Sequence, residues 1–273
     1  MGNSTSGKNP SHPFQRQLAD GTWVLNPTPC SKRRQEYFKR ANEIDIYYTT
    51  AALLIQQGRK AFESWAERED VSGDAPIRIT GWGPTVMTPY KVLRSRFPTL
   101  TQRLTNQAFL MIYGNFEAFL GDMVRDAFAA SGSPDPEGET LKTLSRKSWP
   151  GRFDAIHQRV GVRLPKRQFT VAFQNRRLVF LGQQRKDPRQ FLDDLAQVRH
   201  LLVHSAGRLN AGFLQQYPRA GHSVGDLIKI PSDAPHELQL FFAVMTEIVD
   251  CALADQFGWS RPTKDPAKLL YAQ

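Results

Sequence analysis

The stretch AFLMIYGNFEAFL, from Ala108 to Leu120, is the most apolar segment of the chain and decides the fold class. Apolar residues fall on nearly every side of a helix drawn through it, which is typical of a central helix packed all round. Asn115 and Glu117 interrupt the run, which is shorter than the roughly eighteen residues that suggest a membrane span. We therefore expect a buried core helix that opens after Pro98-Thr99 and ends near Ala130, and no membrane partner.

Three other segments have helical periodicity, and they surround the first in sequence. They cover residues 31–69, with a candidate cap at Ser31, residues 188–206, which start after Asp187, and residues 232–256. Irregular segments separate them, with one short strand expected at 77–79 and an optional hairpin over 168–181 turning at Asn175. The pattern predicts an all-α helical bundle.

Composition divides the chain into four parts. Residues 1–30 are rich in Ser, Gly, Asn and Pro and predict a flexible N-terminal arm. Residues 31–98 predict an N-terminal helix and loop that pack on the core. Residues 99–257 predict the main helical domain, with an irregular basic insertion, and residues 258–273 predict a C-terminal tail.

The positive charge of the chain is concentrated in one window. The whole chain carries a formal charge of +10, yet residues 141–189 hold thirteen Lys and Arg against two Asp, a charge of +11. Such a block attracts polyanions, although a solvated basic face is the plainer alternative. The residues expected to bind RNA are Lys166, Arg167, Arg176, Arg177, Arg185 and Lys186.

Two cysteines, Cys30 and Cys251, lie far apart and do not form a metal-spaced pair. The first residues lack the apolar core of a secretion signal. Both observations favour a reducing, cytoplasmic location.

The segment 199–204, with the sequence RHLLVH, is the main anomaly of the third helix. A helical projection places Arg199 near the middle of an apolar stripe, although burying a guanidinium without a partner costs several kcal/mol. The stripe consists of Leu192, Leu195, Ala196, Leu202, Val203 and Ala206. Arg199 therefore needs either a carboxylate partner inside the protein or a solvent-filled groove into which an anion can bind. The plainer alternative is an internally paired Arg with two histidines that cap the edge of the core.

Two chemistries fit this segment. His200 and His204 have the i, i+4 spacing of a zinc pair, but Leu201 stands where the zinc-protease motif requires Glu. The alternative is cleavage of RNA without a metal or other cofactor, in which His204 moves protons and Arg199 holds the phosphate. The second chemistry also accounts for the basic block.

The same six residues resemble the Arg-polar-x-x-x-His signature of HEPN domains. The likeness extends over about residues 100–256, through the apolar pattern of 113–120, the turn at 205–210 and the stretch 225–230. HEPN domains are helical bundles, and many are metal-independent ribonucleases of toxin–antitoxin, CRISPR and phage-defence systems. His200 stands where the family most often has Asn, so its role stays open.

The resemblance implies an RNA endonuclease that cleaves by transesterification and leaves a 2′,3′-cyclic phosphate. It also implies a homodimer, and an antitoxin or another defence-system protein as partner. We expect the dimer to form through the helices at 188–206 and 232–256. A non-catalytic adaptor that binds RNA or protein in a defence complex is the alternative.

Glu117 is the expected internal partner of Arg199. It shares a helix face with Tyr113 and other apolar residues, so pairing two buried charges would be the cheapest arrangement. A buried pair predicts a loss of ~3 kcal/mol or more for Glu117→Ala. The alternative is that Glu117 points to water past Tyr113.

Overall fold

The computed structural model describes residues 15–17, 23–25, 28–80, 85–132, 149, 151–152, 154, 158, 178–180, 183–185, 187–218 and 222–264. This part of the chain is mostly helical, which confirms the predicted all-α class. Its five helices are α1 (Lys32–Arg68), α2 (Tyr90–Ala130), α6 (Pro188–His204), α7 (Ala211–Gln216) and α8 (Ala234–Phe257). None of the described helices combines the length and the apolar character needed to cross a bilayer.

Short antiparallel strand pairs account for the remaining regular structure. The pairs are β1 (Gln15–Gln17) with β2 (Trp23–Leu25), β3 (Thr28–Pro29) with β8 (Thr263–Lys264), β4 (Pro76–Ile79) with β5 (Val86–Pro89), and β6 (Leu178–Phe180) with β7 (Gln183–Arg185). The expected strand at 77–79 is therefore present, as one half of a hairpin.

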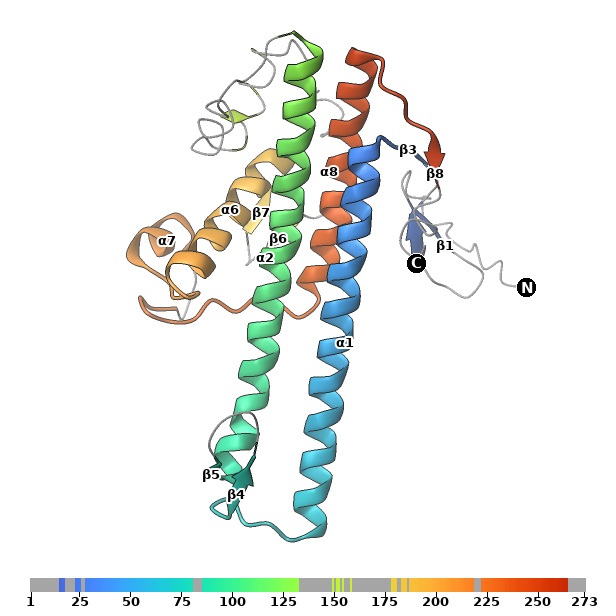
Figure 1. Cartoon of the computed structure of the whole chain (residues 1–273). Coiled ribbons are helices and arrows are strands. Elements are labelled where there is room, and N and C mark those ends of the chain that lie inside the picture. The colour runs from blue at the N-terminus through green and yellow to red at the C-terminus, as the bar shows by residue number, and fades with distance from the viewer. Residues whose placement is uncertain are drawn as a thin grey trace, which may run out of the picture.

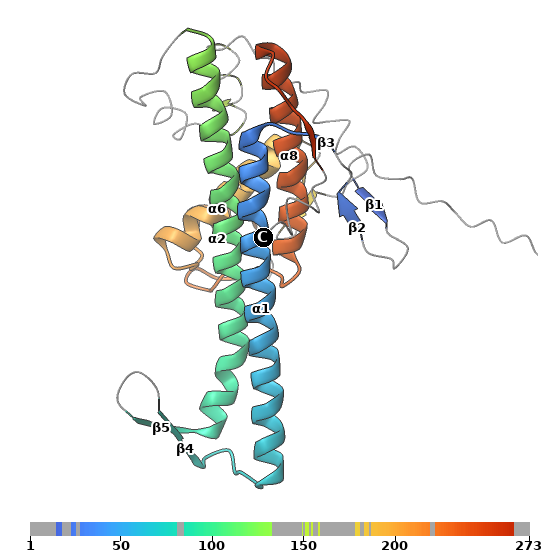
Figure 2. The ribbon, with the colours of Figure 1, turned by 45° about the vertical axis from the view of Figure 1, so that its right-hand side comes forward.

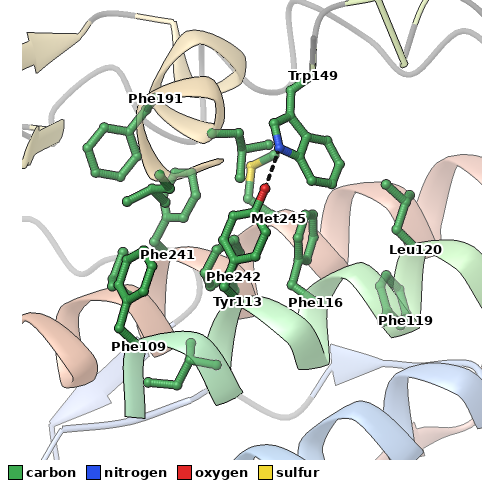
Figure 3. Close-up of a cluster of buried hydrophobic side chains, with 14 of the residues drawn as sticks. Phe109, Tyr113, Phe116, Phe119, Leu120, Trp149, Phe191, Phe241, Phe242 and Met245 are labelled. Atoms are coloured by element: carbon green, nitrogen blue, oxygen red, sulfur yellow. Dashed lines mark hydrogen bonds between the residues drawn. The ribbon is translucent and has the colours of Figure 1, made fainter. Parts of the chain in front are cut away.

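The helix α2 is the centre of the bundle. It runs antiparallel to α1, with α8 alongside both and α6 crossing the other flank of α2 (Figures 1 and 2). Fourteen α2 residues are buried, in agreement with the all-round apolar pattern of 108–120. Aromatic rings join the helices: Phe116 stacks on Phe242 of α8 at 4.7 Å, and Phe191 of α6 meets Phe241 edge-on at 5.0 Å (Figure 3).

Local signals in the sequence determine where α1 and α6 begin. The Ser31 hydroxyl accepts a hydrogen bond from Arg34 N at 3.2 Å, which satisfies one of the unpaired donors of the first turn. The Asp187 carboxylate accepts from Arg189 N at 2.9 Å, and Pro188 occupies the first helical position. Both starts match the predictions.

The start of α2 differs from its prediction. The helix begins at Tyr90, not after Thr99, and continues through Pro98. Proline disfavours a helix interior, but here tertiary packing outweighs that cost. The Phe62 ring of α1 lies 5.1 Å from Tyr90 and 5.8 Å from Phe97, so contact between the two helices stabilises the additional turns. The division expected between 98 and 99 therefore lies inside one helix.

Strand pairs lie in the N-terminal segment and in the basic insertion. Within the segment expected to be a flexible arm, β1 and β2 pair, β3 pairs with the C-terminal β8, and Cys30 N donates to Pro262 O at 3.3 Å. In the basic insertion β6 pairs with β7, whereas Asn175, the expected turn, lies outside the described residues. Most of this insertion lies outside the described residues.

A buried ionic cluster joins the start of α1 to α8. Arg34 forms an ion pair with Glu247, and both side chains are almost fully buried. Asp250, also buried, accepts a hydrogen bond from Ser31 N at 2.9 Å. Burial raises the pKa of Asp250, and the bonds from Ser31 partly offset that rise. The cluster therefore fixes the register of α1 against α8 through directional contacts inside the core.

Replacing Glu247 with Ala is expected to destabilise the fold strongly. Removing one partner leaves the buried guanidinium of Arg34 poorly compensated, which costs roughly 3 kcal/mol or more. Urea denaturation followed by circular dichroism measures the change. Glu63→Ala is the matched control, because Glu63 pairs with Arg59 and Arg94 at the surface. Equal losses in the two variants would contradict the role given to burial.

Candidate functional site

The C-terminal end of α6 is held in one conformation by the turn that follows it. Ser205 N and Gly207 N both donate to Leu201 O, at 2.9 and 3.0 Å. Ala206 and Gly207 have positive φ angles of 49° and 77°, and Ile228 N then donates to Gly207 O at 2.8 Å. A Cβ on Gly207 would lie 3.3 Å from Leu202. These backbone hydrogen bonds therefore fix the conformation of the chain at the end of α6.

The predicted residues Arg199, His200 and His204 lie in the C-terminal part of α6, and none is buried. The expected apolar stripe is wrong in part, because Val203 is 50% exposed and Ala206 is also exposed. The buried face of α6 is formed by Phe191, Leu192, Leu195, Val198 and Leu201. The buried face is displaced around the helix axis from the predicted apolar stripe. Arg199 therefore lies at the margin of the buried face and not at its middle.

The two histidines of the motif are in contact. The ring centroids of His200 and His204 lie 4.5 Å apart, one helical turn from each other, with their planes tilted by 43°. Among the residues described by the structure, no other His, Cys, Asp or Glu joins them in a three-ligand group. Within that part of the chain the two histidines thus lack a third protein ligand for a zinc ion.

Arg199 and Glu117 form the ion pair that the sequence predicts. Arg199 Nη2 lies 3.9 Å from Glu117 Oε2, which links the end of α6 to the middle of α2. The pair is not buried, because the side chains of Arg199 and Glu117 are 43% and 29% exposed. The guanidinium is therefore oriented by the carboxylate yet open to a ligand from solvent.

Arg152 is a member of this cluster that sequence reasoning missed as a site residue. Its Nη1 lies 3.4 Å from the other oxygen of Glu117, Oε1, so one carboxylate lies between two guanidinium groups. The guanidinium of Arg152 also lies over the Trp149 ring, 4.4 Å from the centroid. Arg152 belongs to the basic window, but nothing in its local sequence distinguishes it from the other basic residues there.

A buried hydrogen bond fixes the Trp149 ring on which the Arg152 guanidinium lies. Trp149 Nε1 donates to Tyr113 Oη at 2.8 Å inside the aromatic core (Figure 3). Burial raises the pKa of Tyr113, so its hydroxyl stays protonated and accepts this bond. Trp149 N also donates to Asp193 of α6 at 2.6 Å, and burial raises the pKa of Asp193. Trp149, on whose ring Arg152 lies, is thus hydrogen-bonded to both α2 and α6.

The other predicted RNA-binding residues are not brought to the site by the described structure. Lys166, Arg167, Arg176, Arg177 and Lys186 lie outside the described residues, and of Arg185 only the backbone, in β7, is described. A cavity of about 440 Å³ lies elsewhere, at the start of α1, among Lys32, Arg33, Asp126 and Trp259. Its Arg33 already binds Asp126 through two hydrogen bonds.

The face of α8 expected in a dimer interface is not available. Every residue of α8 from 241 to 250 is buried within the protomer, against α2 and α1. The sequence prediction failed here because a helix that is apolar all round does not indicate whether its own chain or a second copy covers it.

Comparisons with known proteins find no relative. No protein-family model matches the chain, and neither the curated proteins nor the solved structures include a match.

Removing the carboxylate of Glu117 is expected to change stability only slightly. The pair with Arg199 is partly solvated, so Glu117→Ala should cost less than about 1 kcal/mol, and not the larger loss predicted for a buried pair. Thermal and urea unfolding measure this difference. In contrast, Tyr113→Phe removes a buried acceptor and should cost about 1–3 kcal/mol. A larger loss for Glu117→Ala than for Tyr113→Phe would contradict the partly exposed geometry.

Proposed function

We propose that the chain is a metal-independent RNA endonuclease whose site is the exposed end of α6. The observation that carries the proposal is the pairing of Arg199 with Glu117 at the end of the same helix that presents two contacting histidines. A guanidinium that is oriented by a carboxylate but open to solvent is suited to bind a phosphate through two parallel hydrogen bonds. Histidine is the side chain best suited to transfer protons near neutral pH.

In the proposed reaction the ribose 2′-oxygen attacks the adjacent phosphorus. A bond from phosphorus to the 2′-oxygen forms, the bond to the 5′-oxygen breaks, and the products are a 2′,3′-cyclic phosphate and a 5′-hydroxyl. His204 takes the proton from the 2′-hydroxyl or supplies one to the leaving oxygen. Arg199 stabilises the charge that builds on the phosphate, and Arg152 supports it through Glu117.

One protomer supplies only part of this machinery. The entering and leaving oxygens lie on opposite sides of phosphorus, so the two proton transfers occur on opposite sides as well. His200 and His204 lie on one helix face with their rings 4.5 Å apart, and they approach a bound phosphate from the same side. A second copy of the chain would supply the complementary group, in keeping with the expected homodimer.

The basic window gives the substrate class. Residues 141–189 carry a charge of +11, and Arg152 places one member of that window in the cluster with Arg199. A single-stranded polyanion with a 2′-hydroxyl fits both the charge and the histidines. An antitoxin or another defence protein is the partner class that we propose to control such an activity.

Alanine at His204 or Arg199 is expected to abolish RNA cleavage in EDTA and leave the helical circular dichroism spectrum unchanged. Arg199→Lys should also lose most activity, because an ammonium group cannot replace the planar fork of donors. Cleavage of total RNA and detection of cyclic phosphate ends provide the measurement. His236→Ala is the matched control, since His236 is exposed at the start of α8.

Wild-type activity in His204→Ala or Arg199→Ala would overturn the catalytic assignment. RNA binding without any cleavage by the wild-type chain would instead support the adaptor alternative. Cleavage that depends on added zinc would favour a metal site that uses His200 and His204.

RNA affinity is expected to fall steeply with salt, because a bound polyanion releases counterions from the basic window. Replacing Lys166, Arg167, Arg176 and Arg177 with Ala should weaken binding several-fold and lower the slope of log K against log salt by about 3. Fluorescence anisotropy over a range of salt concentrations measures both quantities. An unchanged slope in this variant would place the polyanion site elsewhere.

A further inference from the structure

The long helical pair α1–α2 extends well beyond the rest of the bundle, as Figures 1 and 2 show. We call this projecting part the stalk and define it as residues 45–103, with the β4–β5 hairpin at its tip. Of its described residues, only Ala66 and Thr88 are buried. The α1 portion has 24 residues, so the stalk is about 36 Å long. It is therefore a two-helix layer without a core of its own.

Large apolar side chains are exposed along the stalk. Ile46, Tyr47, Leu53 and Leu54 of α1 are 51%, 41%, 52% and 67% exposed. Leu53 follows Ile46 by seven residues, and Leu54 follows Tyr47 by the same interval. Seven residues are about two helical turns, so the four side chains lie on one side of the helix. No charged residue occurs between Asp45 and Arg59, a stretch of thirteen residues. An exposed apolar stripe of this size marks an interaction surface.

The α2 helix widens this stripe beyond one helix. Tyr47 Oη donates to Gln107 Oε1 at 3.2 Å, so this flank of α1 adjoins the exposed side of α2. Leu100 and Met111 are also exposed on α2, seven residues before and four after Gln107. These three α2 positions share one side of the helix at that spacing. The apolar face therefore covers both helices and continues on α2 to Met111, just past the stalk, and we call it the stalk face.

We propose that the stalk face binds the stalk face of a second copy, so that two helical pairs form a four-helix bundle. Two helices are each about 10 Å wide, so a face about 36 Å long covers on the order of 700 Å². A stable interface needs about 800 Å² per partner, a value close to this area. The two layers are alike, and each offers the apolar cover that the other lacks, as in four-helix bundles.

Charge also favours a second copy over a nucleic acid or a membrane surface. The stripe residues 46–58 are uncharged, and the rest of the stalk carries both signs, six acidic residues against eight basic ones. Two of the four basic residues of its α2 part already have acidic partners, Lys91 with Asp74 and Arg94 with Glu63. A surface that is neutral at its centre and mixed at its margin does not select for anionic partners. The proposed function also calls for a second copy, at the end of α6, but the stalk face is a separate surface and its test does not use RNA.

Sedimentation equilibrium of the full chain tests the proposal. The wild type should be a dimer at micromolar concentration, and Ile46→Glu combined with Leu53→Glu should raise the dissociation constant at least about tenfold. Val224→Glu combined with Leu227→Glu is the matched control, since these residues are 65% and 51% exposed outside the stalk. Far-UV circular dichroism checks that each variant folds. A monomeric wild type, or a stalk variant that dimerises like the wild type, overturns the proposal.

A second measurement covers the case in which the glutamate variant does not fold. In Leu54→Cys the new thiol lies on the stalk face, so a dimer formed through that face should bury it and slow its alkylation relative to a dilution at which the chain is monomeric. Cys30 is buried and Cys251 is half-buried, and the wild-type chain measures their background. Equal alkylation rates at the two concentrations overturn the proposed face.

Discussion

The structure depends on one constraint, which is the need to cover the middle of α2 on every side. Its fourteen buried residues include Phe109, Tyr113 and Phe116, and water cannot face any of them without a large free-energy cost. Three elements supply the cover: α1, α8 and α6 with the Trp149 segment.

The candidate site lies at the edge of the region where other elements pack on α2. Glu117 lies in the most apolar stretch of α2, but at the margin of its buried face, where α6 makes its last turn. There the carboxylate meets Arg199 from α6 and Arg152 from the Trp149 segment. A charged group at the edge of a core is oriented by rigid neighbours and is still reached by solvent, which is the condition for binding an ionic ligand.

The stalk, in contrast, leaves most of the surface of its two helices uncovered. Beyond Ile44 and Leu104, α1 and α2 pack on each other, and only Tyr48 and Gln102 near this end are described as donating hydrogen bonds to the segment before α8. A pair of helices buries just one face of each. Aromatic contacts of Phe62 with Tyr90 and Phe97 hold the pair together. The remaining apolar side chains stay exposed because no third helix of the described chain reaches them.

The sequence predicts the helix class and the starts of α1 and α6, and it offers Glu117 as one possible partner of Arg199. These features follow from periodicity and capping, or from two opposite charges that share apolar faces. Tertiary structure alone decided that α2 begins at Tyr90, that Arg152 joins the site, and that Arg199 and Glu117 remain partly exposed. It also decided that the chain itself buries α8. The physical reason is that a local pattern indicates which face is apolar, whereas the element covering that face depends on contacts between residues distant in sequence.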